Sequence, residues 1–150
     1  MSFWKKLFGG EPKPFMEHPS GDFKSAIDAM EDAIRRLREQ KSRDQWIIFS
    51  AQGEGNGPDD FEIAELRMRG DKLDVGSKPL DVPRMIQAAR TGANSLVADG
   101  AQYSVAAASP REVAQILDAI FRQHFEIRPF ADENDDYAVG AEWWGPEARG

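Results

Sequence analysis

The stretch 61–75, FEIAELRMRGDKLDV, decides how the middle of this chain folds. As a helix it would follow two aspartates and end at Gly70, but its apolar residues form no continuous helical stripe. As a hairpin it turns at Gly70 and Asp71, where glycine readily adopts the positive φ of a two-residue turn. That register places four apolar residues on one face: Leu66, Met68, Leu73 and Val75. The same register places Arg67 opposite Asp74 on the other face, where they are predicted to form an ion pair. Because this register separates apolar from charged residues, we predict the hairpin.

Outward from the hairpin, the periodicity of apolar residues predicts two long helices, over 22–41 and 110–125. The second begins with a capping box, in which Ser109 and Glu112 each bond the other's backbone N–H. A shorter helix is expected over 82–90, ended by Gly92 in the left-handed conformation.

Four further strands are predicted around these helices. The run WIIFSA at 46–51 is continuously apolar, which is typical of a strand covered on both faces. An Asp99-Gly100 turn between two apolar runs indicates a second hairpin. The run YAVGAEWW at 137–144 alternates, which places on one face Tyr137, Val139, Ala141 and Trp143.

These elements predict one α+β domain, because 150 residues suffice for a single core. We expect a mostly antiparallel sheet of five or six strands with the two long helices packed on one face. The domain would span 15–144, between an N-terminal aromatic and basic tail with its linker, 1–14, and a C-terminal tail, 145–150.

Over residues 20–127 the predicted elements follow the order helix, three strands, helix, two strands, helix. This order resembles that of the type III secretion chaperone-like fold, and the small size and acidic composition of the chain are similar to those of that group. The segment SFWKKLF at 2–8 and the strand at 137–144 depart from that pattern. The resemblance implies a fold and assigns no functional residue.

Composition excludes several functions. The formal net charge of -7 disfavours nucleic-acid binding, which needs a positive surface. The absence of cysteine excludes disulfides, thiolate nucleophiles and cysteine-containing zinc sites. No signal peptide and no run of about 20 apolar residues is found, so we expect a cytoplasmic protein.

The glycine-rich stretch 50–61, SAQGEGNGPDDF, is the main candidate for ligand chemistry. It lacks the lysine of a phosphate loop, and Pro58 stands where a dinucleotide fingerprint needs its third glycine. Oxygen ligands suited to a divalent cation are offered by Glu54, Asn56, Asp59 and Asp60. A cation-dependent enzyme or a small-ligand-binding protein built on 54–60 is therefore the alternative function.

Other candidate sites are weaker. The acidic run DENDD at 132–136 lacks the glycine and glutamate that an EF-hand would need at 137 and 143. His18 and His124 show no orienting partner in the sequence pattern. We assign no catalytic residue, expect no cofactor, and consider an enzyme less favoured than a binding protein.

A protein-binding role follows from aromatic residues beside acids. Trp143 and Trp144 are adjacent on a strand, so they must face opposite sides of the sheet. Aromatic anchors near negative charge are typical of interfaces, and we predict the partner site at Trp143, Trp144, Glu142, Asp135 and Asp136. Alternatively both tryptophans are covered, one by helices and one by the segment 2–8.

The preferred function is a non-catalytic, acidic protein-binding module, chaperone- or adaptor-like or immunity-like, for a basic or extended protein. A homodimer is compatible with this function. The N-terminal segment is a candidate for docking or for contact with a membrane surface through Phe3, Trp4, Leu7 and Phe8.

Overall fold

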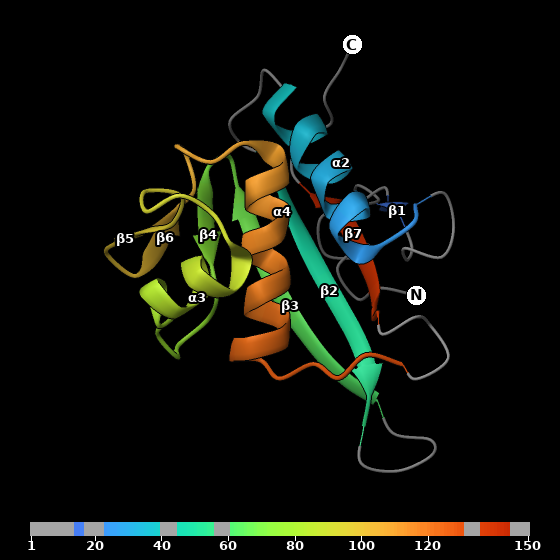
Figure 1. Ribbon diagram of the computed structural model, residues 1–150. Coiled ribbons are helices and arrows are strands. Elements are labelled where there is room, and N and C mark those ends of the chain that lie inside the picture. The colour runs from blue at the N-terminus through green and yellow to red at the C-terminus, as the bar shows by residue number, and fades with distance from the viewer. Residues whose placement is uncertain (1–13, 17–22, 40–44, 56–60, 131–135, 145–150) are drawn as a thin grey trace.

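The computed structural model describes residues 14–16, 23–39, 45–55, 61–130 and 136–144 (Figure 1). The elements in chain order are β1 (Pro14–Met16), α2 (Ala26–Glu39), β2 (Trp46–Glu54), β3 (Phe61–Arg69), β4 (Lys72–Asp74), α3 (Val82–Ala89), β5 (Val97–Asp99), β6 (Gln102–Ser104), α4 (Pro110–Ala119), the π-helical turn η1 (Ile120–His124) and β7 (Ala138–Trp144). This is the predicted α+β arrangement.

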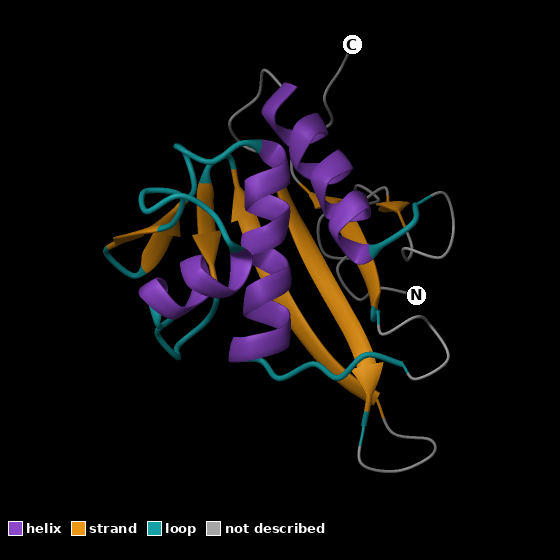
Figure 2. Ribbon diagram, in the orientation of Figure 1, coloured by secondary structure: helices purple, strands orange, loops and turns teal. Residues whose placement is uncertain are grey.

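The described strands form one sheet in the order β1-β7-β2-β3-β4-β6-β5, and every neighbouring pair is antiparallel. All six predicted strands are present. The additional strand, β1, pairs with β7 at the edge and begins at Pro14, where the sequence predicted a linker. The helices α2 and α4 lie on one face of the sheet, and α3 packs beside α4 (Figures 1 and 2).

The central hairpin has the predicted register: Arg69 pairs with Lys72 and Met68 with Leu73. Gly70 adopts a φ of 55°, as the two-residue turn requires. The predicted ion pair between Arg67 and Asp74 is wrong, although the two residues are cross-strand neighbours. The Asp74 carboxylate instead accepts from the backbone N–H of Gly76 at 2.9 Å, and the Arg67 guanidinium lies over the Trp46 ring.

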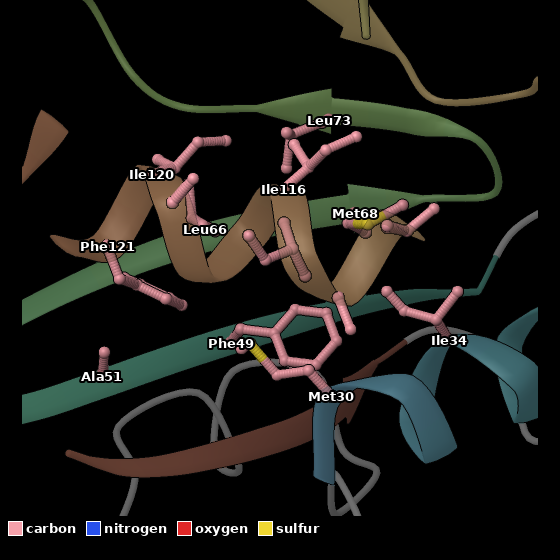
Figure 3. Close-up of a cluster of buried hydrophobic side chains, with 14 of the residues drawn as sticks. Met30, Ile34, Phe49, Ala51, Leu66, Met68, Leu73, Ile116, Ile120 and Phe121 are labelled. Carbon is pink, nitrogen blue, oxygen red and sulfur yellow. The ribbon is translucent and has the colours of Figure 1, made fainter. Parts of the chain in front are cut away.

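The core lies between the sheet and the helices (Figure 3). On β2 the buried residues alternate with partly buried ones, so the prediction that this strand is covered on both faces is wrong. Ile47 and Phe49 are fully buried, whereas Ile48 and Ser50 are partly exposed. The run is apolar throughout, but the helices cover only one of its sides.

The helix ends are set by local hydrogen bonds. The predicted capping box of α4 is present: Ser109 Oγ accepts from Glu112 N at 3.2 Å, and Glu112 Oε1 accepts from Ser109 N at 3.0 Å. At the end of α3 the left-handed residue is Arg90, with a φ of 57°, and not Gly92 as predicted. The β5–β6 turn lies at Gly100 and Ala101, one residue later than predicted, because Asp99 pairs with Gln102.

In the described part of the chain, none of the helices has the length and apolar character needed to cross a membrane.

Candidate functional site

The side of the sheet away from α2 and α4 carries no described helix, and we call it the open face (Figure 1). Side chains alternate along a strand, so the residues between the core positions of β2, β3 and β7 point to this side. They are Trp46, Ile48, Ser50 and Gln52 of β2, Ile63, Glu65, Arg67 and Arg69 of β3, and Ala138, Gly140, Glu142 and Trp144 of β7. The register places Ser50 between Glu65 and Gly140, and Ile48 between Arg67 and Glu142.

Two tryptophans and an arginine form one end of the open face. Trp46 and Trp144 are cross-strand partners whose rings stack with centroids 5.6 Å apart and an interplanar angle of 21°. The Arg67 guanidinium lies 4.7 Å from the Trp46 ring centroid, within the range of a cation–π interaction. This contact holds Arg67 against the sheet, and its charge is partly satisfied by the ring.

The predicted tryptophan anchors are both covered to a large extent. Trp144 is on the open face yet only 6% exposed, and Trp143 is on the helix face and packs partly buried against the core. Of the alternatives raised by the sequence, coverage of both rings agrees better with the structure. The side chain of this predicted group that is well exposed is Glu142.

The exposed part of the open face combines one large apolar side chain, Ile63, with two acids, Glu65 and Glu142, and two arginines, Arg67 and Arg69. Ile63 is 68% exposed and has Glu65 two residues further along the same strand face. Glu65 and Glu142 are exposed and make no ion pair with any described residue. Arg69 marks the opposite, basic end of β3. An apolar side chain beside carboxylates that make no ion pair with a described residue suits a partner that brings both apolar and cationic side chains.

The first glycine of the glycine-rich stretch, Gly53, lies where two backbone segments come close together. A Cβ at Gly53 would lie 2.0 Å from the backbone oxygen of Arg128, because the chain after α4 crosses β2 there. Glu54 N donates to the same oxygen at 2.9 Å, which forms an isolated bridge between Glu54 and Arg128. Only glycine permits this close approach of two backbones.

One of the four predicted cation ligands lies in the described part of the chain. Glu54 is exposed at the end of β2, and Asn56, Asp59 and Asp60 lie outside the described residues. Within the described ranges, no group of three His, Asp or Glu residues has the arrangement of a metal site.

The acidic run ends in a structural network. Asp136 Oδ2 accepts from Ala26 N at 2.9 Å, at the start of α2, and Asp136 Oδ1 accepts from Tyr137 N at 2.9 Å and Arg122 Nη2 at 3.4 Å. A carboxylate at a helix N-terminus is favoured by the helix dipole. Asp136 therefore links β7 to α2, and Asp135, the other predicted partner residue of this run, lies outside the described residues.

Tyr137 is the buried centre of that network. Its hydroxyl donates to Asp118 Oδ1 at 2.7 Å, and Arg122 Nε donates to the same oxygen at 3.0 Å. Burial, followed by the charge of Asp118, raises the pKa of Tyr137 well above its usual value of about 10. The phenol stays neutral at physiological pH, and the network joins α4 to β7.

Of the two histidines, the structure describes His124. His124 ends the π-helical turn η1 and packs edge-on against Phe125, with ring centroids 4.9 Å apart. Burial, and then the charge of Lys78, lowers its pKa. His18 lies outside the described residues, as do Phe3, Trp4, Leu7 and Phe8.

Searches of protein-family models, of curated proteins and of solved structures find no match to this chain.

The sequence analysis did not place Ile63, Glu65 and Trp46 on the open face. The signal for the first two was available, because burial of Leu66 and Met68 in the predicted hairpin puts odd-numbered residues of β3 on the other face. The prediction that the strand 46–51 is covered on both faces gave no reason to expect Trp46 on an open side of the sheet. The alternation of residues along β3 predicted the exposed side of the sheet better than the apolar content of β2 did.

Proposed function

We propose that this protein is a non-catalytic, acidic protein-binding module that engages a basic or partly unfolded protein through the open face. The observation that carries this proposal is that the described helices cover one side of the sheet, which leaves Ile63 68% exposed beside Glu65, a carboxylate with no ion pair among the described residues. Large exposed apolar side chains on an otherwise polar surface are typical of interaction sites.

The physical basis is a division of roles between apolar and charged residues. Burying Ile63 and the exposed parts of Ile48 and Trp46 would stabilise a complex by about 25 cal/mol for each Å² of apolar surface. The carboxylates of Glu65 and Glu142, with the net charge of -7, would accelerate encounter with a basic partner. Binding should therefore weaken as salt is raised.

Two versions of this function differ in the partner. A chaperone or adaptor, which the resemblance to the type III secretion chaperone-like fold favours, holds an extended segment of a poorly folded protein. An immunity-type protein binds one folded, basic toxin very tightly. A toxin gene or a secretion gene beside the coding sequence would distinguish them, and so would the folding state of a captured partner.

The proposal is tested by capturing partners from native extract at low salt with the full chain and its variants. Ile63→Asp and Glu65→Lys change the open face. Ala88→Asp and Glu39→Lys make the same changes of charge at exposed positions of α3 and α2, on the other side of the sheet.

We expect the open-face variants to lose at least tenfold of the captured partner and the helix-side controls to retain it. Equal capture by all four variants would refute the open face as the binding site. Absence of any captured protein at low salt would count against the binding function itself.

A further inference from the structure

The topology brings the N-terminal part of the chain to the edge of the open face. β1 pairs antiparallel with β7, with Pro14 opposite Glu142 and Met16 opposite Ala141. In this register, decreasing residue numbers in β1 run alongside increasing numbers in β7. The chain therefore enters β1 from the end of the sheet that carries Trp144 and Trp46.

The length of chain before β1 is sufficient to reach across this face. Five residues, 9–13, separate Phe8 from Pro14. Fully extended, the six steps between them span at most about 20 Å. The step from β1 over β7 and β2 to β3 is about 14 Å, since neighbouring strands lie about 4.8 Å apart.

The sequence of residues 3–8, FWKKLF, combines large apolar side chains with cations. Four of the six residues are large and apolar, and the other two are lysines. The face offers partly buried Ile48 and Trp46, and it offers Glu65 and Glu142, which make no ion pair with any described residue. It also carries the cations Arg67, over the Trp46 ring, and Arg69, so the lysines of the segment have to lie toward the two acids and away from β3's arginines. Apolar side chains and cations on the segment thus match apolar side chains and anions on the sheet.

Tethering strengthens such a match. A ligand on a short, flexible linker experiences an effective concentration in the millimolar range, so even a weak contact is populated. Residues 9–13, GGEPK, provide a linker of suitable composition.

We propose that residues 3–8 are an intramolecular ligand of the open face, with their aromatic side chains against Trp46 and Ile48 and their lysines toward Glu142 and Glu65. The segment occupies the same surface as the partner of the proposed function, and the inference stands independently of that partner. It assigns the N-terminal segment to this face and not to a membrane surface.

The absence of cysteine permits a direct test. A nitroxide is attached to the single thiol of the full-length Ser2→Cys variant, and amide signals are compared before and after reduction of the label. We expect severalfold broadening of amides in 46–50 and 140–144, and little change in α3 or in the β5–β6 hairpin, at the far edge of the sheet.

Two further variants separate docking from simple proximity. Leu7→Asp with Phe8→Asp removes apolar contacts, and Gly9→Asp with Gly10→Asp adds the same charge in the linker. The selective broadening should vanish in the first and persist in the second. Persistence in both, or uniform broadening over the sheet and helices, would overturn the proposal.

A membrane alternative predicts a different pattern. Binding of the full chain to phosphatidylserine-containing vesicles, with no selective broadening in solution, would overturn intramolecular docking. These readouts involve no partner protein. Because a docked segment competes with a partner, capture is also measured with the Leu7→Asp, Phe8→Asp variant, and failure of capture by that variant, with selective broadening intact in the unmodified chain, would refute the proposed function alone.

Discussion

The two sides of strand β2 differ sharply although they share one backbone. Phe49 is fully buried among residues of α2, β3 and α4, whereas its neighbour Ile48 is partly exposed between Arg67 and Glu142 (Figure 3). The helix side provides the core that stabilises the domain. The open side contributes less to stability, and its residues are therefore available for recognition.

Truncating two adjacent residues of β2, one on each side, tests this difference most directly. Phe49→Ala should lower the free energy of unfolding by about 3–5 kcal/mol, because it removes a buried ring and leaves a cavity. Ile48→Ala should cost about 1 kcal/mol, since its side chain is already partly hydrated. Urea unfolding measures both losses, and equal values would show that the two sides do not differ as described.

A second prediction concerns the point where the chain crosses β2. Gly53→Ala should destabilise the domain by about 1–3 kcal/mol, because its Cβ would lie 2.0 Å from the backbone oxygen of Arg128. Ser50→Ala, on the open face of the same strand, is the control and should be near neutral. An unchanged urea midpoint for Gly53→Ala would mean that residues 127–128 do not approach the strand this closely.

The third prediction uses the neutral, buried phenol of Tyr137. Its pKa in the folded state is raised above the unfolded value of about 10, so the folded chain retains a proton that the unfolded chain loses. This contribution is fully present below pH 10 and is lost as pH rises from there toward the folded pKa.

Tyr137→Phe should lower stability by about 1.5 kcal/mol at neutral pH, because the hydrogen bond to Asp118 is lost. Between pH 9 and 11 the wild type should lose stability more steeply than Tyr137→Phe in urea unfolding. Parallel pH profiles would show that the phenol ionises equally easily in both states.

Much of the fold was predictable because its signals are local. The turn at Gly70 and Asp71 fixed a register, and the capping box of Ser109 and Glu112 marked a helix start. The alternation over 137–144 likewise identified β7 and its buried side.

What the sequence did not show depends on contacts between distant segments. β1 has three residues, too few for any periodicity, and its pairing with β7 joins positions more than a hundred residues apart. Asp136 and Ala26, whose backbone N–H it accepts from, are also more than a hundred residues apart in the sequence. The structural role of Asp136 at the end of the acidic run could therefore not be read from its neighbours in the sequence. The exposure of β2 on one side was missed because apolar content reveals hydrophobicity and not which side is covered.

The central claim is that the open face serves recognition and not stability. The most direct measurement combines urea unfolding and partner capture on one preparation of the Ile63→Asp, Glu65→Lys double variant. We predict an unfolding free energy within about 0.5 kcal/mol of the wild type, as for other exposed sites, with at least a tenfold loss of captured partner. Undiminished capture by a folded double variant would contradict the claim.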